Sequence, residues 1–367
     1  MQVSVSLKHF TRLMGPYGLY QHSSIYQPLL SEGYCTDDNA RAVRLLVRLL
    51  PLLSSQQQRE AKRLLAACWQ FVREAQTEPG VYVNFRDAAG SWQPQTSESE
   101  DMYARVVSCL VALIIHDKDT GRRQEAARML DGLVERVERF LAPRAWAEAL
   151  MALSALAYTG QTTPYVSDLQ KKGYDFLAAL WQKNSSPSWP WFEPVMTYAN
   201  ALFPHALLSL ASYSNLPGRE KILEESASFL ISSTVRNNIF IPIGSARWYP
   251  KGDRPSTDNQ QPIEAGLMFD FLLEYHRFFP SRVLPEVAAA PYLWFFGRNT
   301  GQAVMADANA GASYDGLFSH GINKHRGAES MLAYLWCEVL LAEADPNLRR
   351  LILRLSTPAP PSRPTPD

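Results

Sequence analysis

The sequence predicts an all-α protein whose twelve helices form a closed (α/α)6 toroid, that is, six helical hairpins arranged as an inner and an outer ring. Three observations lead to this fold. Apolar residues recur at helical spacing through almost the whole chain. Helices that are apolar on every side alternate with helices that carry charge on one face, as buried inner and exposed outer helices do. Twelve helices also close a toroid, whereas a superhelical stack of hairpins is the competing architecture.

The expected helices follow one another as six consecutive pairs, and the first helices of the pairs begin at intervals of roughly 45 to 65 residues. The segment from Ala145 to Leu153 is the clearest inner helix, because it is small and apolar all round. The inner helices are expected at residues 37–53, 98–117, 143–159, 196–213, 262–279 and 327–343. The outer helices are expected at residues 55–76, 120–141, 165–184, 218–234, 281–297 and 345–355.

We expect residues 1–355 to form one toroid domain, in which the irregular segment 1–36 covers the central funnel. Residues 356–367 are rich in proline and are expected to be a disordered tail. Long loops precede the inner helices, so they should lie together on the face where those helices begin, and loops on a rigid scaffold commonly carry function. These loops are residues 77–97, 185–195, 235–261 (which includes a short strand candidate at 239–243) and 298–326.

Composition excludes several classes of protein. Lysine and arginine together number 36, as do aspartate and glutamate, so the net charge of zero argues against binding to nucleic acid through phosphate contacts. The longest apolar run is too short to span a bilayer, and the start of the chain lacks the apolar core of a signal peptide. The four cysteines have no metal-binding spacing and indicate reduced thiols in a cytoplasmic protein. We therefore expect no metal site and no cofactor, and activity that survives EDTA.

The segment Gly33 to Arg41, which reads GYCTDDNAR, is the central motif of the predicted functional site. It places two adjacent carboxylates, Asp37 and Asp38, where a loop becomes an apolar helix. One such side chain is enough to cap the free N–H groups of the first helical turn. The second carboxylate is surplus to capping, which suggests a role in function.

Each of the six inner helices begins with carboxylates or amides, and in a toroid these starts converge on one funnel. Carboxylates and amides bind vicinal hydroxyls, and indole rings stack on the apolar faces of sugars. Glycoside hydrolysis needs one protonated acid and one carboxylate. The catalytic candidates are Asp37 and Asp38 with a glutamate across the funnel, Glu264 before Glu329. The candidates for substrate binding are Tyr34, Arg41, Glu100, Asp101, Arg105, Trp189, Trp191, Glu193, Tyr198, Asn200, Trp248, Gln261, His320, Asn323 and His325.

These features resemble the six-hairpin glycosidase superfamily of (α/α)6 toroids. The Asp37-Asp38 pair is similar to the aspartate pair of the endo-α-mannanase family. The motifs GYCTDDNAR, SWPWFE at 188–193, TYANA at 197–201 and GAES at 327–330 look like those of bacterial toroid proteins encoded beside, or fused to, glycosyltransferases and mannoside phosphorylases. The resemblance implies hydrolysis of a mannose- or glucose-type oligosaccharide or polysaccharide, with Asp37 and Asp38 catalytic and a glycosyltransferase as a partner.

Three alternatives remain open at this stage. A sugar 2-epimerase or isomerase on the same toroid would use histidines as acid and base, with His320 and His325 in the right region and His22 and His205 as partners. A prenyl or terpene enzyme would use Asp37-Asp38 to hold magnesium, but Arg41 opposes a second cation there. A glycan-binding toroid without activity could instead serve a glycosyltransferase.

Overall fold

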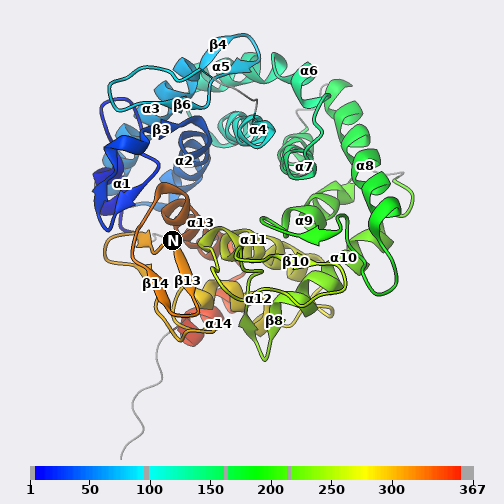
Figure 1. Ribbon diagram of the computed structural model, residues 1–367. Helices are drawn as coiled ribbons and strands as arrows, with labels where there is room; N and C mark the ends of the chain where they lie inside the picture. The colour runs from blue at the N-terminus through cyan, green and yellow to red at the C-terminus, as the bar shows by residue number, and fades with distance from the viewer. Residues whose placement is uncertain (1–4, 95–98, 161–163, 213–215, 357–367) are drawn as a thin grey trace, which may run out of the picture.

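The computed structural model describes residues 5–94, 99–160, 164–212 and 216–356, and it is a ring of helices (Figure 1). Each inner helix packs against the next, and the last packs against the first, which closes the ring. The predicted (α/α)6 toroid is therefore confirmed. The inner helices are α2 (Thr36–Leu49), α4 (Glu100–His116), α7 (Pro143–Tyr158), α9 (Leu202–Ser209), α11 (Pro262–Phe278) and α13 (Ala328–Glu343).

The outer ring surrounds the inner helices and packs on their apolar sides. A short helix, α1 (Lys8–Leu13), lies outside the ring and contacts α13. The outer helices are α3 (Ser55–Ala75), α5 (Thr120–Asp131) with α6 (Val134–Val137), α8 (Pro164–Asn184), α10 (Arg219–Thr234), α12 (Pro285–Trp294) and α14 (Pro346–Ser356).

Three predicted helices differ in their bounds. The inner helix expected at 196–213 begins at Leu202, because residues 195–196 pair with a strand and Ala199 has a positive φ of 50°. The outer helix expected at 120–141 is broken, since α5 ends at Asp131 and Gly132 follows as its C-cap. The outer helix expected at 281–297 is shorter, beginning at Pro285, a residue that suits the first helical turn. The tail expected to be disordered lies outside the described residues from 357 onward.

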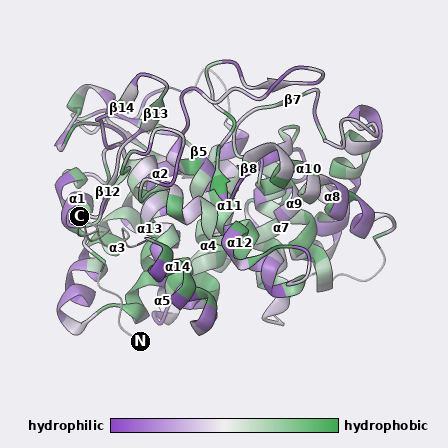
Figure 2. Cartoon of the chain, turned by 90° about the horizontal axis from the view of Figure 1, so that it is seen from below, coloured by the Kyte–Doolittle hydropathy of each residue, from purple (hydrophilic) through white to green (hydrophobic). Residues whose placement is uncertain are grey.

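Short two-stranded ribbons form within the loops at one end of the ring, where the inner helices begin (Figure 2). All pairs are antiparallel. They are β1 (Ser23–Ser24) with β2 (Gln27–Pro28), β3 (Tyr34–Cys35) with β6 (Phe85–Arg86), β4 (Gln76–Glu78) with β5 (Val81–Tyr82), β7 (Val195–Met196) with β10 (Tyr249–Pro250), β8 (Val235–Arg236) with β9 (Ile239–Phe240), β11 (Ala306–Asp307) with β12 (Ala312–Ser313), and β13 (Gly316–Phe318) with β14 (Gly321–Asn323).

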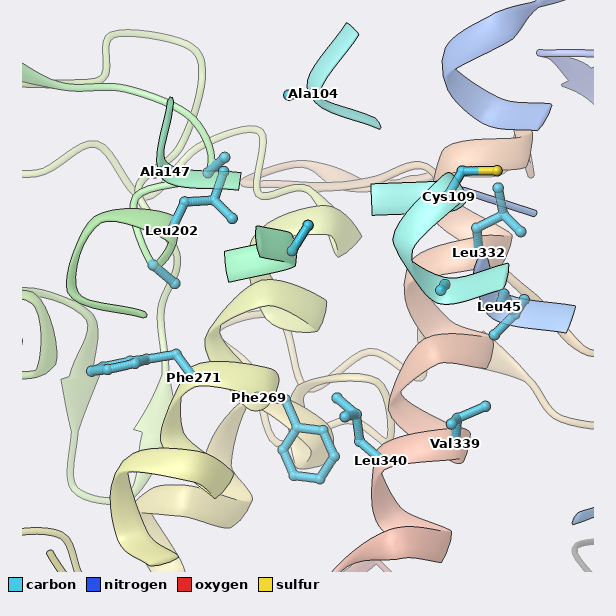
Figure 3. Packing of buried hydrophobic residues seen from close by; sticks show 14 of the residues in the cluster. Leu45, Ala104, Cys109, Ala147, Leu202, Phe269, Phe271, Leu332, Val339 and Leu340 are labelled. Carbon is cyan, nitrogen blue, oxygen red and sulfur yellow. The ribbon is translucent and has the colours of Figure 1, made fainter. Parts of the chain in front are cut away.

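The apolar core fills the space around and between the inner helices. Leu45 of α2, Cys109 of α4, Leu202 of α9 and Phe269 of α11 are among its buried side chains (Figure 3). Burial of this surface supplies the main driving force for folding. Because the core holds the inner helices rigidly, the residues in their first turns are presented as a fixed set.

The N-terminal segment is tied to the loops of the last hairpin by backbone hydrogen bonds. The N–H of His9 donates to the carbonyl of Ala310, and the N–H of Ala328, at the start of α13, donates to the carbonyl of Gln21. Gly311 allows this docking, since a Cβ there would lie 1.8 Å from the carbonyl oxygen of Ser6. The expectation that the segment covers the funnel stays a prediction.

We predict that Gly311→Ala lowers the free energy of unfolding more than Gly252→Ala does. Both glycines have positive φ, at 70° and 87°, so each substitution carries a left-handed strain of about 1–2 kcal/mol. Only Gly311 adds a clash with backbone, because nothing lies within 4 Å of a Cβ at Gly252. Urea denaturation measures both variants, and equal losses would contradict the proposed close docking of the N-terminal segment.

Candidate functional site

The first turns of the inner helices bring three carboxylates around the guanidinium of Arg41. Its Nε lies 2.9 Å from Oδ1 of Asp37, and its Nη1 lies 3.7 Å from Oδ1 of Asp38 and 2.7 Å from Oε2 of Glu329. Asp37, Asp38 and Arg41 share one face of α2 because they are three and four residues apart. Glu329 comes from α13, the helix that closes the ring onto α2.

Helix capping does not use either aspartate. The N-cap of α2 is Cys35, whose sulfur accepts the N–H of Asp38 at 3.4 Å. In the contacts of the described residues, neither aspartate carboxylate accepts a backbone N–H of the helix. The expected capping role of these carboxylates is therefore taken by a thiol, and both aspartates remain directed at Arg41.

A second layer of charges lies below the first, deeper in the ring. Arg105 of α4 pairs with Glu148 of α7, and its Nε lies 3.8 Å from Oδ1 of Asp37. Glu148 also accepts the hydroxyl of Ser108 at 3.1 Å and lies 3.9 Å from Arg44. Charges of alternating sign thus continue from the loop face into the ring.

Arg44 extends this network to a fifth inner helix. Its Nη2 lies 3.8 Å from Oδ2 of Asp270 on α11, which also accepts the indole N–H of Trp336 at 2.8 Å. Our choice of site residues from the sequence missed Arg44, Glu148 and Asp270. The available signal was a charged residue inside an otherwise apolar inner helix, which must find a partner when it is buried.

The carboxyl group of Asp38 binds its proton tightly. Burial raises the pKa of Asp38 to about 7, with Asp37 and Glu329 adding repulsion while Arg41 opposes the shift. The network contains five carboxylates, of Asp37, Asp38, Glu148, Asp270 and Glu329, and three arginines, Arg41, Arg44 and Arg105. A proton on Asp38 relieves part of this excess of negative charge, since the group is only 7% exposed.

Glu264 is also a buried carboxyl group with a raised pKa, but it occupies a different position. Its Oε1 accepts the N–H of Ala199 at 2.5 Å, and it lines a small internal cavity with Asn200 and Thr234. Burial raises the pKa of Glu264 to about 7. No ion pair links it to Arg41 in the described residues, so the structure brings Glu329, rather than Glu264, to the aspartate pair.

A second polar group lies on the neighbouring helix starts. Arg144 of α7 donates two hydrogen bonds to Glu193, at 3.0 and 2.9 Å, and stacks under the ring of Tyr198 at 4.4 Å. The hydroxyl of Tyr198 donates to Asp101 at 2.8 Å. Tyr198 is 40% exposed, so one aromatic ring is available at this point for a ligand.

Several predicted binding residues have structural partners. The carboxylate of Glu100 accepts the N–H groups of Leu141 and Ala142 at the start of α7. Tyr34 is fully buried and stacks on Tyr20. Asn200 is buried and donates to the carbonyl of Thr197.

The expectation that Trp189 and Trp191 offer their faces to sugar is wrong. Trp191 is completely buried and packs against Phe203 and Phe229, while Trp189 is 2% exposed and packs against Phe229 and Tyr249. These indoles belong to the core beneath the loop. Trp248, on the same loop face, is only partly buried, and Gln261, the N-cap of α11, is also partly exposed.

Three histidine candidates make no contact with Asp37, Asp38 or Glu329 in the described residues. His320 is exposed and stacks on Phe318 in the β13–β14 ribbon, and His325 is exposed beyond it, where its N–H donates to Asn323. His205 is buried and pairs with Glu274 at 2.7 Å. We call Arg41, Asp37, Asp38 and Glu329 the Arg41 cluster. Within the part of the chain that the structure describes, no histidine ring contacts this cluster, and no group of three or more His, Cys, Asp or Glu side chains could hold a metal ion.

Comparison with known proteins finds matches only among solved structures, since no family model and no curated protein matches the sequence. The fold is similar to a D-mannose isomerase, at 13% identity and TM-score 0.68 over 91% of this chain and 94% of that one. It is similar to cellobiose 2-epimerase from Bacillus thermoamylovorans B4167, at 10% identity and TM-score 0.66 over 91% and 95%. It is also similar to the GH76A α-1,6-mannanase from Salegentibacter sp. HEL1_6, at 10% identity and TM-score 0.58 over 94% and 96%.

At such low identity these likenesses establish the fold alone. They support the (α/α)6 toroid, which the chain shares with both the isomerising and the glycan-cleaving proteins. The narrower likeness to bacterial toroid proteins with the GYCTDDNAR and GAES motifs remains a prediction. Among the described residues, no helix has the length and apolar character to cross a membrane.

We predict that Trp191→Ala lowers the free energy of unfolding by about 3–5 kcal/mol, since it removes a fully buried indole from an aromatic cluster. Trp248→Ala, on the same face but partly exposed, should cost clearly less. Denaturant unfolding measures both. A small loss for Trp191→Ala would return this indole to the list of ligand-stacking candidates.

We predict that Asp38→Asn stabilises the protein, relative to the parent, more at pH 8 than at pH 5. Asp38 has a folded pKa of about 7, above the ordinary value of about 4 in the unfolded chain. The folded protein therefore retains a proton that the unfolded chain loses, and stability from this group falls as pH rises between these values. Asparagine has no such dependence. Urea denaturation at both pH values, with exposed Asp168→Asn as control, tests this, and a pH-independent difference would show that Asp38 is ionised throughout.

Proposed function

We propose that the protein is a glycoside hydrolase that cleaves a mannose- or glucose-type oligosaccharide or polysaccharide. The observation that carries this proposal is the sharing of Arg41 by Asp37, Asp38 and Glu329, one of which holds a proton near neutral pH. Glycoside hydrolysis requires this combination of one protonated and one ionised carboxyl group. The toroid fold is shared with known glycosidases, which is consistent with the proposal.

Asp38 is proposed as the general acid. Its pKa of about 7 allows it to be protonated in the resting enzyme and to give up that proton to the glycosidic oxygen as the bond breaks. The thiol of Cys35 donates to Oδ2 of Asp38 at 3.2 Å and fixes the orientation of the carboxyl group. Asp37, held by Nε of Arg41, contributes the negative charge that keeps the proton on its neighbour.

Glu329 is proposed as the carboxylate that attacks the sugar. Its side chain is 45% exposed, so a substrate can reach it, and Arg41 holds it at 2.7 Å. Asp38 and Glu329 both contact Nη1 of Arg41, at 3.7 and 2.7 Å, so they are near neighbours. This arrangement suits the about 5–5.5 Å separation of retaining enzymes better than the roughly 6.5–9.5 Å of inverting ones.

A retaining reaction then proceeds in two steps. Glu329 forms a bond to the anomeric carbon as Asp38 protonates the departing oxygen, which leaves a glycosyl-enzyme ester. Asp38, now ionised, takes a proton from water as that water attacks the anomeric carbon and releases Glu329. Both carboxyl groups return to their starting protonation states.

Glu264 is assigned to support of the site rather than to the chemistry, which reverses the order expected from the sequence. Its Oε1 accepts a hydrogen bond from the backbone N–H of Ala199, a residue with positive φ in the turn before α9, and no ion pair joins it to Arg41 in the described residues. Tyr198 and Asp101 are proposed to bind the substrate beside it, because the Tyr198 ring is exposed and its hydroxyl is already oriented.

The sequence motifs further suggest where the protein works. We propose a glycosyltransferase as a partner, from the resemblance of GYCTDDNAR and GAES to toroid proteins that accompany such enzymes. We propose action in the cytoplasm, because all four cysteines are free and buried.

Epimerisation or isomerisation of a sugar at C2 is the second candidate function. Asp38 and Glu264 both have pKa values of about 7, as an acid and a base that exchange protons with carbon need. No histidine ring contacts the Arg41 cluster in the described residues, so these carboxyl groups would replace the histidines expected for such an enzyme. Incorporation of solvent deuterium at C2 of the sugar is the distinguishing result.

We predict that Asp38→Asn and Glu329→Gln each lower turnover of a mannan or glucan oligosaccharide by at least about a hundredfold, the scale of acid–base catalysis. The matched control is Glu343→Gln, at the other end of α13, where Glu343 pairs with Arg48. It should leave turnover near normal. Near-normal activity of both site variants would overturn the assignment.

The product anomer, read by NMR at early times, tests the proposed stereochemistry on the same substrates. Retention of the anomeric configuration is expected. Inversion would mean that water, rather than Glu329, attacks the sugar. Deuterium at C2 without cleavage would replace the hydrolase proposal with the epimerase, and glycan binding with neither reaction would indicate a binding protein.

A further inference from the structure

A second polar hollow lies on the outside of the ring, against α1. Its volume is about 440 Å³, within the range of about 300–1,000 Å³ typical of small-molecule sites. Strands β2 and β11 and the turn after β11 form its other walls. Its lining residues are Lys8, Arg12, Tyr26, Gln27, Asp307, Asn309 and Ala310.

The carboxylate in this hollow already has partners. Oδ2 of Asp307 accepts the hydroxyl of Tyr26 at 2.5 Å, and Oδ1 accepts the N–H of Ala310 at 3.1 Å. Lys8 and Arg12 are exposed, one turn apart on α1, and neither side chain forms an ion pair with a described residue. The hollow therefore presents two cations, neither of which forms an ion pair with Asp307, against the one negative charge of that carboxylate.

A third cation is buried behind the wall of the hollow. Arg326 is 4% exposed and lies against the rings of Tyr26 at 3.9 Å and Tyr314 at 4.2 Å. Its Nε and Nη1 have no hydrogen-bond partner among the described residues. Burying an arginine without a paired anion is costly, so a negative charge nearby is favoured.

The neighbouring groups balance only part of this positive charge. Against its burial, the pKa of Asp307 is lowered by hydrogen bonds from Tyr26 and Ala310 and by the charge of Arg326. Burial lowers the pKa of His9, whose Nε2 faces the carbonyl of Arg326, so the ring is neutral. Asp315 directs Oδ1 at the N–H of Gly327, at the start of α13. Gln27 and Asn309 supply amide groups, which bind hydroxyls as donors and acceptors.

We propose that this hollow binds a small phosphate monoester of the hexose phosphate type, independently of the reaction in the ring. The phosphate faces Lys8 and Arg12, with the positive field of Arg326 behind Tyr26. The guanidinium of Arg12 can donate two parallel hydrogen bonds to phosphate oxygens. The sugar hydroxyls face Gln27 and Asn309. The site lies outside the ring, whereas the Arg41 cluster lies within it.

Titration calorimetry of the full chain tests the proposal, with glucose 6-phosphate, inorganic phosphate and glucose as probes at low salt. Glucose 6-phosphate should bind, and Lys8→Gln combined with Arg12→Gln should weaken it at least about tenfold, because two charge-assisted contacts are lost. The matched control combines Arg139→Gln with Lys221→Gln, whose side chains are 78% and 76% exposed on other parts of the surface. It removes the same charge and should bind as the parent does.

The other results of the titrations either support or overturn the proposed phosphate site. Inorganic phosphate that binds and competes with glucose 6-phosphate supports an anion site, whereas equal binding of glucose argues against one. Weaker binding at higher salt is expected for these exposed charges. The proposal is overturned if no probe gives heat, if the Lys8 and Arg12 variant binds unchanged, or if the control variant weakens as much. Circular dichroism of both variants confirms that the fold is intact.

Discussion

The guanidinium of Arg41 is the group on which the centre of this molecule depends. It lets carboxylates of α2 and α13 approach one another where the first and last hairpins meet. Without a cation, three carboxylates in a partly buried funnel would repel one another and resist burial. The same contact also joins the two ends of the ring, so closure of the fold and assembly of the site are coupled.

The alternation of charges below Arg41 follows from the same constraint. Inner helices are apolar on most sides, and each charged residue within them needs a partner from another helix. Arg105 pairs with Glu148 on the adjacent helix α7, and Arg44 of α2 reaches past α13 to Asp270 of α11. Burial, with added repulsion from Asp37 and Glu329, raises the pKa of Asp38, and the proton that it retains eases the remaining excess of negative charge.

Backbone groups compete with ligands for the polar side chains at the helix starts. Glu100 accepts hydrogen bonds from the backbone N–H groups at the start of α7, and Glu264 accepts one from the turn before α9. Cys35 caps α2 through its sulfur and thereby leaves both aspartates to Arg41. A carboxylate at a helix start is therefore free to bind a ligand only when another group accepts the hydrogen bonds of the nearby backbone N–H groups. The aromatic residues are divided in the same way, since Trp191 completes the core while Tyr198 keeps an exposed ring.

The sequence by itself determined the toroid. Helical periodicity and the alternation of apolar and amphipathic helices are local properties, so they can be recognised in the order of residues along the chain. It also determined that Asp37, Asp38 and Arg41 share a face, since their spacing on one helix fixes this. It did not determine that Glu329 rather than Glu264 meets them, that Glu148 and Asp270 complete the network, or that Trp189 and Trp191 are core. Those outcomes depend on the rotation and offset of helices far apart in the chain. Ring closure sets them, and only the tertiary structure decided them.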